Sequence, residues 1–391
     1  MKTAAKDFTT TELGPIPKDW EVKRLGDVGE PLMCKRVLKS QTSDSGDVPF
    51  YKIGTFGGEA DSFISQELFD SFRRQYSYPK KGDVLISAAG TIGRSVAFDG
   101  KDAYFQDSNI VWIGNDETIV SNEYLRWCYG TVKWHTEDGG TVSRLYNNNL
   151  RETLILVPPL PEQRKIAAAL SDVDEMIAAL ERLIEKKRKI KNGAMQRLLT
   201  GKTRLPGFKG AWVEKRLGEV VEVLDNRRVP LNDSQRQSGP YPYCGANGIV
   251  DFIDRYIFDE EVILMAEDGG NFQDFANRPI AYKMRGKFWV NNHAHVLKAV
   301  IGIDQDFLFC QLVHKDITDT ITGGTREKLT RGQLENLMVV FPPTITEQKA
   351  IAKVLGDMDE EIAAQEAELA KTRQLKQGMM QELLTGKTRL V

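Results

Sequence analysis

A long internal repeat constrains the fold of this chain more than any other feature. Residues 157–205 and 341–390 carry nearly the same sequence, and from Glu162 and Glu347 onward the two copies align without a gap. A different segment precedes each copy. At 391 residues the chain is long enough for two or three domains that each bury a core. The repeat therefore predicts two modules of common architecture, each followed by the same element.

The repeated element is predicted to be a long helix. Apolar residues recur in each copy at alternating steps of four and three, which is the spacing of a coiled-coil seam. The seam residues are Ile166, Leu170, Val173, Ile177, Leu180 and Ile184 in the first copy, and Ile351, Leu355, Met358, Ile362 and Leu369 in the second. Because neither seam can remain in water and both have the same length, we expect the two helices to pack on each other in antiparallel orientation.

The ends of these helices carry local signals. Pro161 suits the first helical turn, and Thr346 suits an N-cap in the second copy. Gly201 and Gly386 follow a Leu-Leu pair closely and are expected to end the helices. About 38 residues at 1.5 Å per residue give a rod of roughly 57 Å.

The glycine ends also resemble part of a phosphate-binding loop, because each reads Gly-Lys-Thr. That loop needs a glycine at the places where Gln196 and Gln381 stand, and it needs a preceding strand rather than a helix. We therefore favour helix termination over nucleotide binding.

The repeat continues into the modules. Residues 20–26 recur as 212–218, and residues 139–159 are similar to 323–343, whereas the sequences between these shared edges diverge. Short β-type runs at 83–86, 110–113 and 261–264 are separated by turn residues, and short helices are expected at 123–129 and 305–313. The expected fold is mixed α/β (α+β), with two globular domains of similar fold at 1–157 and 206–342. Helical spacers at 158–205 and 343–391 separate them as an antiparallel coiled coil, which gives an internal pseudo-twofold repeat.

Composition limits the classes of function. The formal net charge is −2, so any contact with nucleic acid must depend on local basic patches. The four cysteines form no C-x-x-C pair, which argues against a zinc site or a disulfide framework and favours a reducing compartment. Neither an apolar leader nor a run of eighteen apolar residues is present, so we expect a cytoplasmic protein without a membrane segment.

Sequence motifs for catalysis are weak. His293 and His295 are spaced to lie on one face of a strand, but one pair is not a metal site, and packed or hydrogen-bonded histidines are the favoured interpretation. A contact of His293 with nucleic acid is the alternative. The sequence has no glycine motif for a methyl donor or dinucleotide and no arguable Ser-His-Asp or Cys-His set. We expect a non-catalytic chain without a bound metal or cofactor.

Basic and polar loop residues are the remaining candidates for a site. As a set they could hold phosphates and read base edges, although any one of them is more simply a solvated surface charge. The candidates for DNA contacts are Lys35, Arg36, Lys52, Arg73, Arg74, Lys80, Lys81, Thr91 and Arg94 in the first module, and Arg227, Arg228, Arg278, His293, Arg326, Lys328 and Arg331 in the second.

The repeated motifs resemble those of the specificity (S) subunits of type I restriction–modification systems, and the resemblance covers the whole chain. It is carried by Pro-Pro with Glu-Gln at 158–163 and 342–348, by Leu-Leu-Thr-Gly-Lys at 198–202 and 383–387, and by Trp20 and Trp212. The second Pro-Pro motif has one extra residue, which is expected to shift only the start of the helix.

The resemblance implies two target recognition domains, each reading one half of an asymmetric, interrupted site in double-stranded DNA. It also implies helices that separate the domains and dock two modification (methyltransferase) subunits, with two restriction (motor–nuclease) subunits completing a host-defence complex. S-adenosylmethionine and the pocket for a flipped adenine are then expected on the methyltransferase partner. A rod of roughly 57 Å agrees with two heads held about one helical turn of DNA, roughly 34–36 Å, apart.

Three alternatives remain open from the sequence. The chain could be an enzyme with this module attached, although it is short and lacks catalytic motifs. It could be a coiled-coil scaffold that binds proteins rather than DNA. It could also be an orphan S-like protein without restriction partners.

Overall fold

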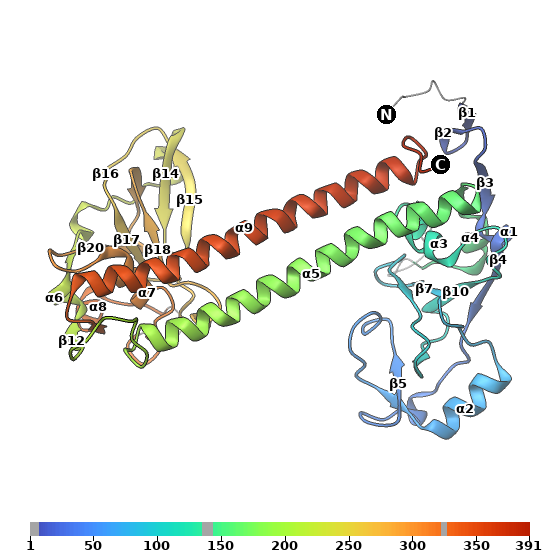
Figure 1. The fold of residues 1–391 in the computed structure, drawn as a ribbon, viewed down its shortest axis with the longest axis horizontal. Helices are drawn as coiled ribbons and strands as arrows, with labels where there is room; N and C mark the ends of the chain where they lie inside the picture. Colours follow the sequence, from blue (N-terminus) through green and yellow to red (C-terminus); the bar gives the residue numbers. More distant parts are fainter. Residues whose placement is uncertain (1–7, 135–143, 322–326) are drawn as a thin grey trace. The chain divides into compact units, whose positions relative to one another are not determined.

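The computed structural model describes residues 8–134, 144–321 and 327–391 (Figure 1). The chain forms two compact units. The first combines the chain up to Ala179 with Glu368–Val391, and the second is the continuous segment Leu180–Ala367. Helix α5 (Leu160–Leu198) and helix α9 (Ile345–Leu383) each contribute one part to each unit. The first unit is therefore built from the two ends of the sequence.

Helices α5 and α9 run antiparallel within each unit. Each has 39 residues, which corresponds to about 58 Å at the usual rise. In the second unit Lys187 pairs with Glu361 at 2.5 Å, and Lys191, one turn further along α5, pairs with the earlier residue Asp359 of α9. In the first unit Lys376 pairs with Asp174 at 2.5 Å. The predicted antiparallel helix pair is confirmed.

The predicted seam residues face away from solvent to different degrees. Those that are buried are Ile166, Leu170, Ile184, Ile351, Leu355 and Ile362. Those that are half-buried are Val173, Ile177, Leu180, Met358 and Leu369. Burial of the seam residues is strongest where each helix lies against a globular domain, because both the domain and the partner helix cover the seam there.

Helices α5 and α9 end close to the predicted glycines, but the N-cap predicted for α9 is wrong. Gly201 and Gly386 both have φ of 70°, and Thr203 N–H donates to the carbonyl of Arg197 at 3.1 Å in a closing turn. Gly-Lys-Thr thus terminates each helix. Thr346 is not the N-cap of α9, as the sequence suggested: the helix already starts at Ile345, and the hydroxyl of Thr344 accepts from Glu347 N–H at 3.3 Å.

The first unit contains two main sheets. A four-stranded antiparallel sheet has the order β4-β10-β7-β8, and a three-stranded sheet has the order β6-β5-β9 with β5 and β9 parallel. The strands are β4 (Gly29–Met33), β5 (Val48–Tyr51), β6 (Phe63–Ile64), β7 (Val84–Ser87), β8 (Ser95–Ala97), β9 (Tyr104–Phe105) and β10 (Ile110–Asn115). Two smaller pairs are β1 (Phe8–Thr11) with β2 (Gly14–Pro17) and β3 (Glu21–Arg24) with β11 (Leu154–Val157). The short helices are α1 (Leu25–Val28), α2 (Gln66–Gln75), α3 (Asn122–Tyr129) and α4 (Asn147–Glu152).

The second unit repeats this topology. Its four-stranded sheet has the order β13-β20-β17-β18, and a second sheet has the order β15-β14-β19-β16 with β14 and β19 parallel. The strands are β13 (Val221–Val223), β14 (Ser238–Gly245), β15 (Gly248–Ile253), β16 (Phe258–Asp259), β17 (Val262–Ala266), β18 (Ala281–Met284), β19 (Lys287–Val290) and β20 (Ala294–Ala299). Strands β12 (Val213–Arg216) and β21 (Met338–Phe341) pair, and the short helices are α6 (Leu217–Val220), α7 (Gln305–Leu312) and α8 (Arg331–Glu335). The mixed α/β fold with an internal repeat is confirmed.

Two Glu-Gln pairs explain why the repeat is so similar at the helix starts. Buried Glu162 accepts from Trp20 Nε1 at 3.1 Å and from Arg389 Nε at 2.6 Å. The twin Glu347 accepts from Arg204 at 2.5 and 2.6 Å. The arginine that follows each Gly-Lys-Thr thus anchors the end of one long helix to the start of the other. We call these two contacts the tail anchors.

Among the described residues, no helix combines the length and the apolar composition needed to cross a bilayer.

Candidate nucleic-acid interface

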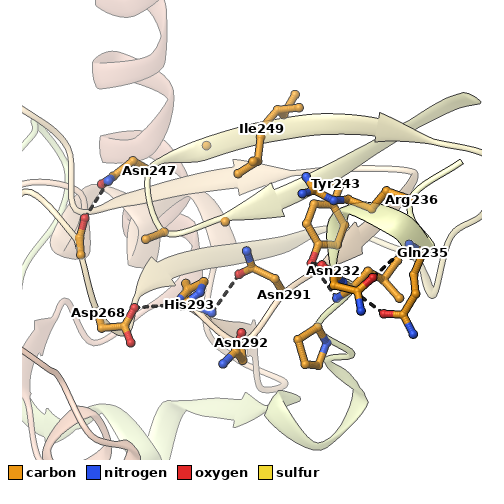
Figure 2. Close-up of a pocket in the computed structure, with 17 residues that line it drawn as sticks. Asn232, Gln235, Arg236, Tyr243, Asn247, Ile249, Asp268, Asn291, Asn292 and His293 are labelled. Atoms are coloured by element: carbon orange, nitrogen blue, oxygen red, sulfur yellow. Dashed lines mark hydrogen bonds and ion pairs between the residues drawn. The ribbon is translucent and has the colours of Figure 1, made fainter. Parts of the chain in front are cut away.

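A cleft of about 850 Å³ with several amide side chains opens on the second unit (Figure 2). Four segments form its walls: the chain between β13 and β14, the adjoining ends of β14 and β15 with the turn between them, the residues that follow β17, and the turn between β19 and β20. These segments are far apart in sequence, and the strand order of the two sheets brings them together. The cleft is therefore a product of the tertiary fold.

The β19–β20 turn presents three polar side chains in succession, Asn291, Asn292 and His293. Nδ1 of His293 lies 2.5 Å from Oδ1 of Asp268, which follows β17 (Figure 2). The backbone N–H of His293 donates to Oδ1 of Asn291 at 2.8 Å. The side chain of Asn292 is exposed, and no hydrogen bond to another described residue occupies it. The turn is thus held on both sides while one amide remains available to a ligand.

The other walls add an amide and a guanidinium. Asn247, in the β14–β15 turn, donates from Nδ2 to the carbonyl of Gly269 at 2.8 Å. The guanidinium of Arg236 lies 5.3 Å from the ring centroid of Tyr243 and 3.3 Å from a carboxylate oxygen of Asp251. Both groups are fixed in place and line the cleft.

The chemistry of the cleft suits recognition of base edges. Asparagine and glutamine amides can donate and accept together at the edge of adenine, arginine can pair with guanine, and a carboxylate can accept from the amino group of cytosine. Among the described residues that line the cleft, none is a serine, threonine, cysteine or lysine that could act as a nucleophile. The arrangement can hold and discriminate polar ring edges.

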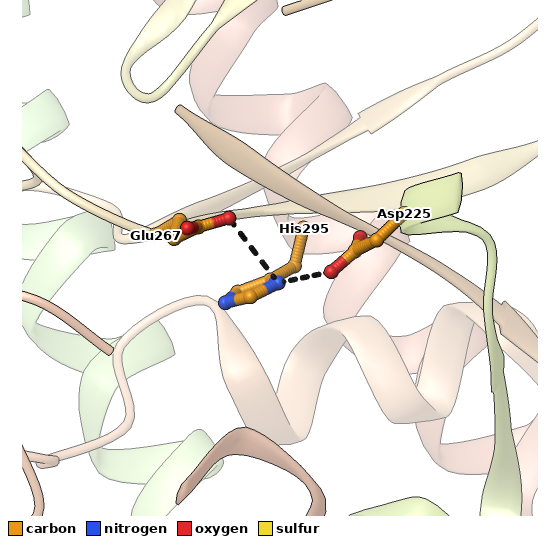
Figure 3. A group of neighbouring side chains, drawn as sticks. All are labelled: Asp225, Glu267 and His295. Carbon is orange, nitrogen blue, oxygen red and sulfur yellow. Dashed lines mark hydrogen bonds and ion pairs between the residues drawn. The ribbon is translucent and has the colours of Figure 1, made fainter. Parts of the chain in front are cut away.

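Three charged or titratable side chains, Asp225, Glu267 and His295, lie close together next to the β19–β20 turn; Figure 3 shows the three side chains. Nδ1 of His295 is 2.6 Å from Oδ2 of Asp225 and 3.8 Å from Oε2 of Glu267. Nε2 of His295 is 2.8 Å from the carbonyl oxygen of Leu329. Each ring nitrogen therefore faces an oxygen atom, which fixes the orientation of the imidazole.

Cations surround the two carboxylates of this group. Arg228 donates to Glu267 at 2.6 Å, and Lys328 Nζ lies 2.9 Å from the same carboxylate. Burial raises the pKa of Asp225, but the hydrogen bond from His295 and nearby positive charge outweigh burial and leave the pKa lowered. Burial likewise raises the pKa of Glu267, and hydrogen bonds from Arg228 and Lys328 lower it overall. The group forms an ion network in which Arg228 pairs with both carboxylates and Lys328 pairs with Glu267. We call Asp225, Arg228, Glu267, His295 and Lys328 the buried ion network.

The first unit places different residues at the corresponding loops. Thr91 is exposed in the β7–β8 loop, and Arg94 donates from NH1 to the carbonyl of Phe56 at 2.9 Å. Arg144 donates to the hydroxyl of Ser108 at 2.6 Å, beside a cleft of about 390 Å³. Gly90, with φ of 65°, turns the chain after β7 as Gly269, with φ of 63°, turns it after β17. The frames of the two sites match, whereas the side chains differ.

The other basic candidates of the first unit lie on its surface. Ion pairs join Arg36 with Asp107, Lys52 with Asp61, and Arg73 with Asp102. Lys35, Arg74, Lys80 and Lys81 are also exposed. Exposed ion pairs contribute about 0–1 kcal/mol to stability, so a phosphate could displace these carboxylates at little cost.

In the second unit the structure separates the candidates into two groups. His293 lines the cleft, and Arg228 and Lys328 meet at Glu267 beneath it. Arg227 pairs with Glu260, Arg331 pairs with Glu335, and Arg278 is exposed; none of these three lines the cleft. Arg326 lies outside the described residues.

The candidates predicted from the sequence do not include the amide side chains of the cleft or two arginines beside the two clefts. These residues are Asn232, Gln235, Asn247, Asn291, Asn292, Arg236 and Arg144. Asn291 and Asn292 directly precede His293 between two β-type runs, so the run of three polar residues was a usable signal. Asn232, Gln235 and Asn247 carried none, because asparagine and glutamine are common in turns and loops.

Comparison with known proteins agrees with this fold. A putative type I restriction enzyme specificity subunit of Haemophilus influenzae is 58% identical over 156 residues, which are 40% of this chain and 40% of that protein. The putative type I restriction enzyme MjaX specificity subunit of Methanocaldococcus jannaschii is 24% identical over 98% of this chain and 97% of its own length. The crystal structure of a type I restriction-modification S subunit from M. genitalium matches with a TM-score of 0.65 at 16% identity, over 93% of this chain and 96% of that one.

The family model described as the type I restriction modification DNA specificity domain matches residues 17–192 and 209–372. The two matches cover most of the chain and correspond to the two repeats. The chain therefore belongs to the family of type I restriction–modification specificity (S) subunits, which are non-catalytic and carry target recognition domains.

Proposed function

We propose that each globular domain reads one half of a bipartite, interrupted site in duplex DNA. The observation that carries this proposal is that the two units share the strand order of the four-stranded sheet, and that of the second sheet apart from the additional β16, while the loops at corresponding positions carry different side chains. A common frame with different polar groups suits two readers with different specificities. The recognition domains span 1–157 and 206–342, and the helical regions span 158–205 and 343–391.

In the second domain, Asn291, Asn292 and His293 read base edges in the cleft. Lys328 and the exposed arginines nearby contact phosphates, which position the domain without reading sequence. In the first domain, Thr91, Arg94 and Arg144 take the corresponding roles. The remaining surface candidates add electrostatic attraction to the duplex.

Helices α5 and α9 set the length of the unread spacer between the half-sites. Two heads that read the same side of B-DNA need centres about 34–36 Å apart, and a helix of about 58 Å is long enough to hold them with its ends covered by the domains.

The same helices dock two modification subunits, because a pseudo-twofold chain offers one partner two equivalent surfaces. In this proposal S-adenosylmethionine binds to the methyltransferase partner and two restriction subunits complete the cytoplasmic complex.

Mapping methylated adenines in a host that carries this chain with its modification partner tests the proposal. We expect one interrupted motif with two different halves, which disappears when this chain is deleted. A complex that assembles but yields no motif and shows no salt-dependent DNA binding would instead support the scaffold alternative. An orphan chain would assemble with no modification subunit.

Each single substitution in a recognition loop is expected to lower sequence discrimination at one half-site only. Asn292→Ala removes an amide that faces the cleft, and loss of a bidentate base contact costs about 1–3 kcal/mol of discrimination. Arg94→Ala, in the β7–β8 loop, is the variant for the first domain. Competition binding with duplexes altered in one half-site measures the discrimination of each variant. The prediction fails if either variant loses discrimination equally at both half-sites.

A further inference from the structure

We propose that the buried ion network positions the β19–β20 turn for base reading and is not required by the fold itself. The proposal rests on the DNA-reading function above and identifies positioning residues behind the second recognition site. Its support comes from comparison of the two domains position by position.

The backbone hydrogen bonds align the two domains. The N–H of Leu145 donates to the carbonyl of Ala88 at 2.8 Å, and the N–H of Leu329 donates to the carbonyl of Glu267 at 2.8 Å. Ala88 and Glu267 are therefore equivalent. The isolated bridges agree, since they pair Ala89 with Arg144 and Asp268 with Lys328.

The strand register extends the alignment to the positions of His295 and Asp225. Two residues before Ala88, Ile86 pairs with Val111, and two residues before Glu267, Met265 pairs with His295. Val111 and His295 are therefore equivalent. On the neighbouring strand Met33 pairs with Val111. In the second unit Val223 pairs with Leu297, and the carboxylate of Asp225, two residues after Val223, lies 2.6 Å from Nδ1 of His295.

The first domain thus fills the same three places with Met33, Val111 and Ala88. Val111 is 2% exposed and Ala88 is fully buried in the apolar core. The frame folds with apolar side chains where the second domain has Asp225, His295 and Glu267. Replacing a buried ionic group by apolar residues is often neutral or stabilising, because burial of charge costs desolvation free energy. Stability alone does not explain the charges.

The contacts of the buried ion network with the β19–β20 turn explain these charges. Arg228 donates to the carbonyl of Ala294 at 2.8 Å and reaches the carbonyl of Asn292 at 3.4 Å, on either side of His293. The N–H of Glu267 also donates to the carbonyl of His293 at 2.8 Å, but the first domain has the same backbone bond, from Ala88 N–H to the carbonyl of Asn109 at 2.7 Å. The contact that the network adds to the turn is therefore made by Arg228, which its carboxylates hold in place.

Fixing the turn matters for affinity and specificity. A loop held in its bound conformation avoids the entropy cost of ordering on binding, and a polar site loosened by about an ångström loses discrimination. Arg228, which the sequence suggested as a DNA contact, is then a positioning residue. Lys328, with 47% of its side chain exposed, links the network to the surface.

The test replaces the charged core of the network by apolar residues, with the first domain's residues at the three equivalent places. In the complex with modification subunits, the quadruple variant Asp225→Met, Arg228→Met, Glu267→Ala, His295→Val leaves no buried guanidinium without a carboxylate, so we expect it to assemble and to unfold at an unchanged or higher temperature. Discrimination at one half-site should fall at least tenfold while the other half-site is read as before. Unchanged discrimination at both half-sites, or a quadruple variant that does not fold, overturns the proposal.

A second variant keeps the test decisive. Arg228→Met removes the donors to the turn and is expected to cause the same loss at the same half-site, with partial recovery in Arg228→Lys. Asp306→Asn breaks the surface pair with Lys283 in the same domain and is the control without effect on discrimination. Discrimination by a folded Arg228→Met complex equal to that of the control contradicts the proposal. If the unmodified complex reads neither half-site, the proposed function fails independently of these variants.

Discussion

We expect four residues inserted into α5 and four into the facing part of α9 to lengthen the proposed unread spacer by one or two base pairs and to leave both half-sites unchanged. Four helical residues add about 6 Å and turn the helix about 40° beyond a full turn. One base-pair step is about 3.4 Å long, and about ten steps make a turn of the duplex. The added length thus matches about two steps and the added rotation about one.

The insertions belong between Ala179 and Leu180 in α5 and between Ala367 and Glu368 in α9, where the two compact units meet in sequence. Methylation mapping of the variant gives the spacer directly. An insertion in α5 alone is the control, and we expect it to weaken assembly because the two seams no longer match. Mapping that returns the original spacer from the double insertion contradicts the role of the helices as a ruler.

Removal of either tail anchor is expected to destabilise its own unit by about 3–5 kcal/mol, the cost of leaving a buried charge without its partner. In Arg389→Ala the buried carboxylate of Glu162 loses two hydrogen bonds of 2.6 Å and retains the donor of Trp20. In Arg204→Ala the carboxylate of Glu347, which is fully buried, loses both of its bonds to the guanidinium. Trp212 makes no compensating bond, since its indole N–H has no hydrogen-bond partner among the described residues.

Denaturant unfolding of the complex measures these losses, with a separate transition expected for each unit. Lys387→Ala and Lys202→Ala are matched controls, because both lysines are exposed in the same tails. Changes at such surface positions are usually within about 0.5 kcal/mol. Equal effects of Arg389→Ala and Lys387→Ala would show that the anchor contributes nothing to stability.

Local features of the fold were predictable from the sequence, because they depend on neighbouring residues. The steps of four and three predicted α5 and α9, and Gly201 and Gly386 predicted their ends. Thr346 was assigned wrongly because the extra residue after the second Pro-Pro motif moves the helix start, and two threonines were available as caps. A choice between adjacent cap residues depends on backbone geometry that composition does not reveal.

The candidate site was harder to predict, because it is assembled over long separations. Asp225, Glu267 and His295 lie on three different segments and meet only through the register of β20 with its neighbours. From the sequence alone, Arg228 and His293 are both candidates for DNA contacts. Their different roles follow from burial and hydrogen bonds, which depend on tertiary structure.

The division of the chain into units has a consequence for synthesis on the ribosome. The second unit is one continuous stretch, whereas the first needs Glu368–Val391 to complete it. Domains generally fold as units while the chain emerges, N-terminal parts first. The unit whose larger part is translated first must therefore wait for the codons of Glu368–Val391, and a premature stop before these codons damages a domain that was synthesised much earlier.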